Sequence, residues 1–137
     1  MLEFRTAGRH RVIAIGGTQL ASLRDWLAAL DLGILKAREG GAGALLLDFR
    51  TQGFTPSARE ANAIVSTLVA LCAERVPPVA ILTNAGAQYG GARMLCTLGE
   101  LRTCRAAAFR VEAEAWRWLE DQMEGHPAEP APIALEV

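Results

Sequence analysis

One stretch decides how the C-terminal half of the chain folds: TNAGAQYGGARM, residues 83–94. The Val/Ile-rich run at 79–83 leads into it and predicts a buried strand. The glycines predict a turn, followed by a short helix over about 89–98. A further strand over 101–106 and a closing helix over 112–123 complete this half.

The first residues predict an antiparallel hairpin. Apolar and charged residues alternate over 2–5, which is typical of a half-buried strand, whereas 12–15 is a continuous apolar run. Residues 6–10, which include Gly8, connect the two as a turn.

A helix is expected to follow, with Thr18 as its N-cap and Gly40-Gly41 at its end. An earlier end near Gly33 is an alternative. Apolar residues spaced three and four apart define its buried face, namely Leu20, Leu23, Trp26 or Leu27, Leu30 and Ile34. In the closing helix, Trp116 and Trp118 lie about 200° apart around the axis, so one of the two indoles is expected to face outward.

The central segment predicts a strand covered on both faces. Residues 44–49 are apolar at almost every position, which favours a parallel strand between helices. A loop over 50–54 leads into a helix that starts at 55–57 and runs to about Arg75. The pair Pro77-Pro78 prevents the helix from continuing.

These elements define an α/β fold in one domain, residues 1–123. We expect a mixed sheet of four to five strands with an N-terminal β-hairpin, flanked by about four helices. The order of the strands stays open at this point, and with it the face on which each helix lies. Residues 124–137 are rich in Pro, Ala and Glu and predict a disordered tail.

Composition narrows the classes of function. The chain has 137 residues and a formal net charge of −1, from 14 basic and 15 acidic side chains. This balance argues against binding of nucleic acid, which requires a surplus of positive charge. Charged residues interrupt the apolar runs near the N-terminus, and the apolar stretch at 63–73 is about half of the roughly 20 residues needed to span a membrane. We therefore expect a cytoplasmic protein without a membrane span.

The cysteines and histidines predict neither disulfides nor a metal site. Cys72, Cys96 and Cys104 are an odd number without CxxC spacing, and each lies in an apolar pattern, which favours core thiols in a reducing compartment. His10 and His126 are far apart and have no ligand-type neighbours at a suitable spacing. No cofactor is expected.

Signals of catalysis are weak. Gly16-Gly17 follows a strand, but the GxGxxG spacing of a dinucleotide site is missing. No Ser/His/Asp, Cys/His or paired-carboxylate set can be assembled, which favours a protein that is not an enzyme; a lone acidic base has no sequence signature and stays an alternative. The glycines at 86–91 open a helix, where backbone N–H groups can hold an anion, with Arg93 one turn further on.

Three groups of residues resemble a known superfamily. They are Tyr89-Gly90-Gly91-Ala92-Arg93-Met94, the pair Phe109-Arg110, and Glu114-Ala115-Trp116-Arg117-Trp118-Leu119. In these groups the chain resembles small, uncharacterised bacterial members of the STAS-like (SpoIIAA-like) superfamily, the fold of the anti-sigma-factor antagonists. The resemblance covers about residues 1–122 and implies a STAS-like fold.

In the antagonists, a strand that ends in Asp leads to a helix whose N-terminal serine is phosphorylated, which switches off partner binding. The corresponding region here runs from Asp48 to Ala58. Ala58 occupies the acceptor position, Ser57 lies beside it, and the Asp-Ser-Ser-Gly run is missing. From the residues themselves, Ser57 and Glu60 predict a capping box, and Thr55-Pro56 a further capping pattern.

The sequence therefore predicts a non-enzymatic regulatory or protein-interaction module of STAS-like type, without an intact phospho-acceptor motif. The alternative is a small-ligand protein that binds a lipid or an anionic metabolite in the cleft between helix starts. Self-association through an outward Trp118 or an alanine-rich helix face is a further option. The residues predicted to bind the partner or ligand are Asp48, Thr55, Ser57, Arg59, Tyr89, Gly90, Gly91 and Arg93.

Overall fold

The computed structural model describes residues 2–51, 53–72 and 75–124, and the predicted tail lies outside these residues except for its first one. The described part has the α/β fold expected, with a mixed five-stranded sheet and four helices. In chain order its elements are β1 (Leu2–Ala7), β2 (His10–Gly16), α1 (Leu23–Gly40), β3 (Ala44–Asp48), α2 (Ala58–Leu71), β4 (Val79–Leu82), α3 (Ala87–Glu100), β5 (Ala106–Phe109) and α4 (Glu112–Glu124).

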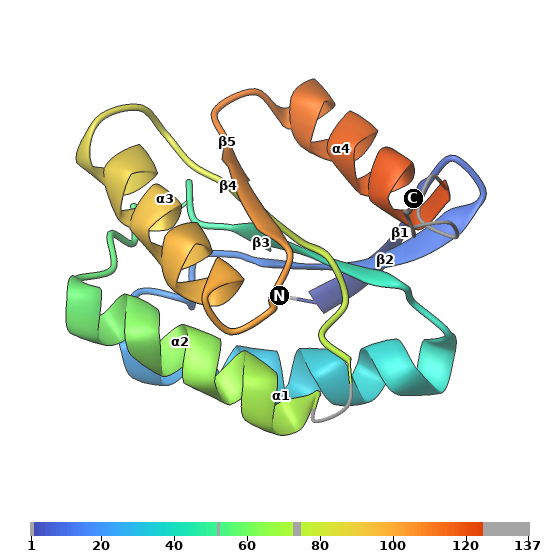
Figure 1. The fold of residues 1–137 in the computed structure, drawn as a ribbon, viewed down its shortest axis with the longest axis horizontal. Coiled ribbons are helices and arrows are strands. Elements are labelled where there is room, and N and C mark those ends of the chain that lie inside the picture. Colours follow the sequence, from blue (N-terminus) through green and yellow to red (C-terminus); the bar gives the residue numbers. More distant parts are fainter. Residues whose placement is uncertain (1, 52, 73–74, 125–137) are drawn as a thin grey trace, which may run out of the picture.

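The strands lie in the sheet in the order in which they occur in the chain, β1-β2-β3-β4-β5. β1 and β2 form the predicted antiparallel hairpin, and β2 to β5 are mutually parallel. Each crossover helix therefore links neighbouring strands in the same direction, and right-handed crossovers bring α1, α2 and α3 to one face of the sheet. The last helix, α4, covers the other face (Figure 1).

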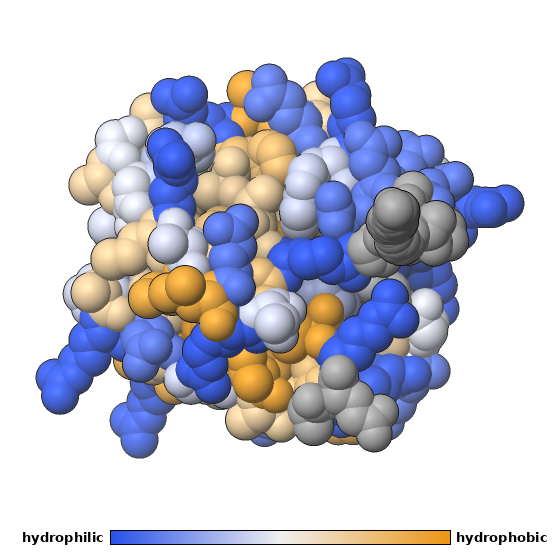
Figure 2. All heavy atoms as spheres, viewed as in Figure 1, coloured by the Kyte–Doolittle hydropathy of each residue, from blue (hydrophilic) through white to orange (hydrophobic). Residues whose placement is uncertain are grey.

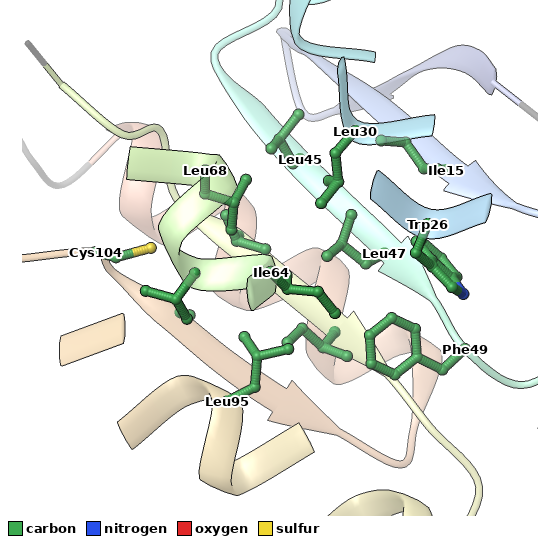
Figure 3. Close-up of a cluster of buried hydrophobic side chains, with 14 of the residues drawn as sticks. Ile15, Trp26, Leu30, Leu45, Leu47, Phe49, Ile64, Leu68, Leu95 and Cys104 are labelled. Carbon is green, nitrogen blue, oxygen red and sulfur yellow. The ribbon is translucent and has the colours of Figure 1, made fainter. Parts of the chain in front are cut away.

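The core has two layers, one on each face of the sheet. On the face of α1, α2 and α3, alternate strand residues such as Ile15, Leu45 and Leu47 pack against buried helix residues (Figure 3). On the other face, a smaller cluster that includes Leu46 and Leu82 packs against Ala115 and Leu119 of α4. Burying each large aliphatic side chain stabilises the fold by about 1.5–3 kcal/mol, so the first layer contributes most of the hydrophobic stabilisation.

Three aromatic rings fill the first layer where β3 ends. The ring centroid of Phe49 lies 4.8 Å from that of Trp26 and 5.3 Å from that of Phe54, both in edge-to-face geometry. Such pairs add about 0.5–1.5 kcal/mol each beyond the area that they bury. The cluster therefore anchors both sides of the loop that connects β3 to α2.

The last strand was predicted at the wrong place. Residues 101–106 were expected to form it, but β5 spans Ala106–Phe109 and Leu101 is 77% exposed. Residues 101–103 form a turn in which Thr103 has a φ of 59°, and the amide of Cys104 donates to the carbonyl of Gly99 at 2.8 Å. Alanines have low strand propensity, but here they pair with β4 because helices cover both faces of the sheet.

The helix boundaries also differ from the predictions. Helix α1 starts at Leu23, with Ser22 rather than Thr18 as its N-cap, and it continues without a break through Gly33. A Cβ atom on Gly33 would lie 2.6 Å from Cδ1 of Ile15, so this glycine allows α1 to approach β2 closely. Helix α3 starts two residues earlier than predicted, and α2 ends at Leu71 rather than near Arg75.

Neither indole of α4 is fully outward, which corrects the prediction for Trp118. Both tryptophans are half-buried. The ring of Trp118 packs 5.8 Å from that of Phe109, and the guanidinium of Arg5 lies 5.1 Å over the ring of Trp116. Because α4 lies flat on the sheet, residues on both flanks of its buried stripe contact strands.

Candidate functional site

The candidate site lies at the sheet edge where the parallel strands end. The register aligns Asp48 of β3 with Leu82 of β4, and Leu82 with Phe109 of β5, so the loops that follow these strands emerge side by side. Two of these loops lead directly into α2 and α3. In parallel α/β sheets this edge is where ligands and partners usually bind.

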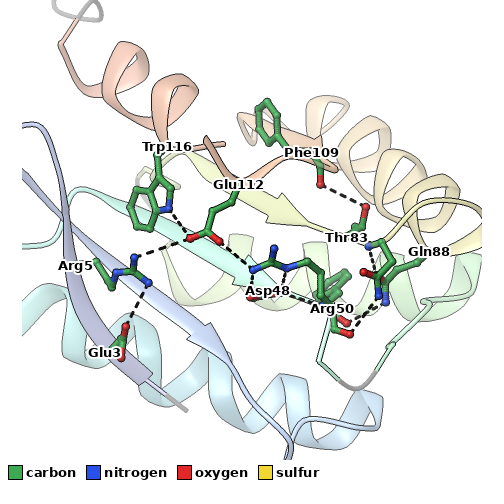
Figure 4. Close-up of polar contacts among 11 residues, drawn as sticks. Glu3, Arg5, Asp48, Arg50, Thr83, Gln88, Phe109, Glu112 and Trp116 are labelled. Atoms are coloured by element: carbon green, nitrogen blue, oxygen red, sulfur yellow. Dashed lines mark hydrogen bonds and ion pairs between the residues drawn. The ribbon is translucent and has the colours of Figure 1, made fainter. Parts of the chain in front are cut away.

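A buried glutamine holds the two loops together. Gln88, in the first turn of α3, is 5% exposed. Its side-chain amide nitrogen donates to the carbonyl oxygens of Phe49 at 3.0 Å and Phe54 at 2.9 Å, while its Oε1 accepts from the backbone N–H of Asn84 at 2.6 Å. Figure 4 shows Gln88 with Thr83 and Arg50 at this edge of the sheet. The side-chain amide of Asn84 also donates to the carbonyl of Arg50 at 3.3 Å. The β3–α2 loop is therefore fixed to the start of α3.

Gln88 was missing from the predicted site residues, although it lies within the stretch that decides the fold. Glutamine is an ordinary helix former, so its position in a helix carries no signal. Its role depends on the position of the neighbouring loop, which only the strand order reveals.

The start of α2 has the predicted capping box. Oγ of Ser57 accepts from the backbone N–H of Glu60 at 3.1 Å, and Oε1 of Glu60 accepts from the backbone N–H of Ser57 at 2.9 Å. Thr55 does not cap this helix; its hydroxyl donates to the carbonyl of Gly53 at 3.2 Å. The Ser57 hydroxyl thus has a structural role while its residue stays exposed.

The two predicted glycines of α3 differ in their surroundings. A Cβ atom on Gly91 would lie 3.0 Å from the carbonyl oxygen of Pro56, which is tighter than most Cβ contacts, so Gly91 favours the close packing of α3 on the residues before α2. A Cβ atom on Gly90 would meet nothing within 4 Å, and this residue is exposed. Gly91 therefore belongs to the scaffold and Gly90 to the surface.

Arginines dominate the outer side of the two helix starts. Tyr89 is half-buried, and the guanidinium carbon atoms of Arg93 and Arg110 lie 5.9 Å and 4.6 Å from its ring centroid. Arg59, on the first turn of α2, is exposed. Among the described residues, no carboxylate forms an ion pair with Arg59, Arg93 or Arg110. We call the surface formed by Thr55, Arg59, Tyr89, Gly90, Arg93 and Arg110 the helix-start face.

Asp48 is not part of the helix-start face. It shares the α4 side of the sheet with Leu46, whereas α2 and α3 lie on the opposite side. Its carboxylate accepts from Nε of Arg50 at 2.9 Å and from Nη2 at 2.8 Å, and Nη2 also donates to Glu112 at 3.3 Å. The alternation of side chains along β3 explains this placement, because Asp48 and Leu46 are two residues apart.

These ion pairs determine the charge state of the carboxyls. Burial raises the pKa of Asp48, but the hydrogen bonds from Arg50 outweigh it and leave the pKa lowered. The pKa of Glu112 is lowered by the hydrogen bond from Nε1 of Trp116, at 3.1 Å, and by Arg50. The pKa of Arg50 is raised in turn. A cavity of about 280 Å³ beside this network is thus lined by charges that already pair with one another.

The thiols lie in the core, as predicted. All three cysteines are buried and free of disulfides. Burial raises the pKa of Cys96 to about 12 and that of Cys104 to about 11, so neither thiol supplies a thiolate at neutral pH. Within the part of the chain that the structure describes, no group of three or more His, Cys, Asp or Glu residues is arranged to hold a metal ion.

None of the helices in the described ranges is long and apolar enough to cross a membrane. Comparison with known proteins adds no relative: no family model matches the chain, nor does any curated protein or solved structure.

Proposed function

We propose that this protein is a non-enzymatic, cytoplasmic interaction domain of STAS-like type, which binds an acidic surface of a partner protein through its helix-start face. One observation carries the proposal. Arg59 lies on the first turn of α2, Arg93 on the second turn of α3 and Arg110 directly after β5. No carboxylate within the described residues forms an ion pair with them.

The scaffold beneath this face supports a binding role. Gln88 fixes the loop before α2, and the close contact of Gly91 with Pro56 fixes the distance between α3 and that loop. A face fixed in this way loses little conformational entropy when a partner binds. Arginine is also enriched among the residues that dominate the binding energy of protein interfaces.

The STAS-like assignment rests on the motif residues. The structure has the Tyr-Gly-Gly-Ala-Arg-Met run at the start of α3, Phe109 at the end of β5, and the Trp-containing motif within α4. Ala58, at the position of the phospho-acceptor, has no hydroxyl, and the hydroxyl of Ser57 caps α2. We therefore propose binding that is independent of a phosphate switch at position 58.

A protein partner is favoured over a small ligand at this edge. The cavity beside Asp48 has its charges paired internally, so an anionic ligand would have to displace Asp48 or Glu112 from Arg50. Breaking such partly buried ion pairs costs free energy that a small ligand must first recover. The exposed guanidiniums of the helix-start face need no such displacement.

The test is capture of partners from the cells that make the protein, with the full chain as bait. The double variant Arg59→Glu/Arg93→Glu is expected to lose more than about 90% of the partner that the unchanged protein retains, because like charges then face each other. Arg117→Glu, an exposed charge reversal on α4, is the matched control and is expected to retain the partner. Equal retention by the double variant, with unchanged thermal stability, would contradict the proposal.

A further inference from the structure

A second concave surface lies at the opposite edge of the sheet, where the parallel strands begin. It is a cavity of about 630 Å³ between the β1–β2 turn, the segment between α1 and β3, the segment before β4, the residue before β5 and the end of α4. In Figure 2, strongly hydrophilic side chains crowd the right-hand side, where the hairpin and the end of α4 lie in Figure 1. No predicted site residue lies here.

The side chains that line this cavity are mostly positively charged. Four arginines line the cavity, and the only described carboxylate in the lining is that of Glu124. This concentration stands out in a chain with a formal net charge of −1. We call this surface the arginine cavity, with the lining arginines Arg9, Arg11, Arg75 and Arg105.

Two of the arginines are held in place by neighbouring groups. Nη1 of Arg11 donates to the carbonyl of Gly40 at 2.7 Å, and its guanidinium lies 4.1 Å over the ring of Phe4. Nη1 of Arg105 donates to the side-chain oxygen of Gln122 at 2.9 Å. These contacts restrict the rotamers of both side chains, so less entropy is lost when an anion binds them.

The other two arginines are more open. The side chain of Arg75 makes no hydrogen bond or ion pair with any residue that the structure describes. The side chain of Arg9 is 82% exposed, and its Nε lies 3.8 Å from Oε2 of Glu124, which is long for a hydrogen bond. Glu124 also lies 3.3 Å from Nε2 of His10. Among the lining residues that the structure describes, one carboxylate therefore lies beside four guanidiniums.

We propose that the arginine cavity binds a small anion that carries phosphate groups, such as a phosphorylated metabolite. The planar guanidinium fork matches the geometry of phosphate oxygens and binds them in a bidentate manner. The volume lies within the range of about 300–1,000 Å³ that is typical of small-molecule sites. This site is independent of the proposed function, because it lies at the other edge of the sheet.

A small anion fits better than a nucleic acid. Nucleic-acid surfaces extend as basic patches or stripes over a face and follow a backbone of regularly spaced phosphates. Here the positive charges converge on one hollow, from segments that lie far apart in the sequence. The remainder of the chain carries an excess of acidic over basic side chains, which disfavours a longer polyanion.

The experiment is a titration of the isotope-labelled full chain with pyrophosphate, followed by NMR of the backbone amides. Saturable shifts are expected at His10, Arg11 and Arg105, with few changes at residues 55–59. Arg75→Gln and Arg9→Gln are each expected to weaken binding roughly ten-fold, because each removes one phosphate contact. The matched control Arg117→Gln, an exposed arginine on α4 outside both sites, is expected to bind within about two-fold of the unchanged protein.

Three results would overturn this proposal. The first is the absence of saturable shifts up to about 10 mM pyrophosphate, an affinity too weak for a metabolite site. The second is binding that Arg75→Gln and Arg9→Gln leave unchanged. The third is binding of an RNA or DNA oligonucleotide more tightly than pyrophosphate, with an affinity that depends on many more phosphates than the cavity can hold. None of these results bears on partner capture by the helix-start face.

Discussion

The side-chain amide nitrogen of Gln88 donates to the carbonyl oxygen of Phe54 at 2.9 Å, so a residue of α3 holds the loop that leads into α2. The same nitrogen also donates to the carbonyl of Phe49 at the end of β3. One buried side chain thus joins two helix starts that come from different crossovers. The helix-start face owes its fixed geometry to this contact.

Replacing Gln88 is expected to destabilise the protein strongly. Gln88→Leu fills a similar volume but leaves two buried carbonyls and one backbone N–H without their partner. We expect a loss of about 2–4 kcal/mol in the free energy of unfolding, measured by urea denaturation. Asn84→Ala, which removes one exposed hydrogen bond, is the control and should cost less than about 1 kcal/mol. A loss below about 0.5 kcal/mol for Gln88→Leu would show that this contact is not needed.

Much of the fold could be predicted from local patterns. The apolar runs at β3 and β4 and the glycines around α3 are strong signals, and the Ser57–Glu60 capping box was predicted correctly. The last strand was not, because alanines carry little strand propensity and Leu101 resembles a core residue although it is exposed. Its position depends on pairing with β4, which is a long-range contact.

The two candidate sites also differ in how far the sequence predicts them. Arg59, Tyr89 and Arg93 lie at helix starts that the sequence predicts, so their common face could be foreseen. The arginine cavity could not, because its residues come from five separate segments that converge only through the parallel register. The face of the sheet on which Asp48 lies depends on which side chains of β3 point toward α4, and local patterns leave this open.

The two neighbouring glycines of α3 provide a matched pair. Gly90→Ala has open space around the new methyl group and is expected to stabilise the protein by about 0.5–1 kcal/mol through higher helix propensity. Gly91→Ala places the methyl group against the carbonyl of Pro56 and should be at least about 1 kcal/mol less stable than Gly90→Ala. Thermal unfolding of both variants gives the comparison. Equal stabilities would mean that α3 can move away from Pro56 without cost.

Stability should fall in acid because of the network around Arg50. The pKa values of Asp48 and Glu112 are lowered in the folded protein, so their contribution is fully present above about pH 5 and is lost as the pH falls through the folded pKa values. Asp48→Asn should therefore lose stability less steeply than the unchanged protein between about pH 5 and pH 3. Urea denaturation at several pH values measures the slope. Asp121→Asn, an exposed aspartate on α4, is the control, and an identical slope for Asp48→Asn would refute this account.

The thiols should react slowly in the native protein. Cys96 and Cys104 are buried, and burial raises the pKa of both groups. At pH 8 we expect a colorimetric thiol reagent to label them at least about 100-fold more slowly than in denaturant. Rapid labelling of either thiol in the folded protein would instead indicate an opening of the α3–β5 region.

The helix-start face is the central claim, and photo-crosslinking in the cells that make the protein tests it most directly. A photoreactive amino acid is placed at position 59, 93 or, as a control on α4, 117, and the adducts are identified by mass spectrometry. We expect the same protein adduct from positions 59 and 93 and none from 117. An adduct from 117 alone, or no adduct from 59 and 93, would contradict it.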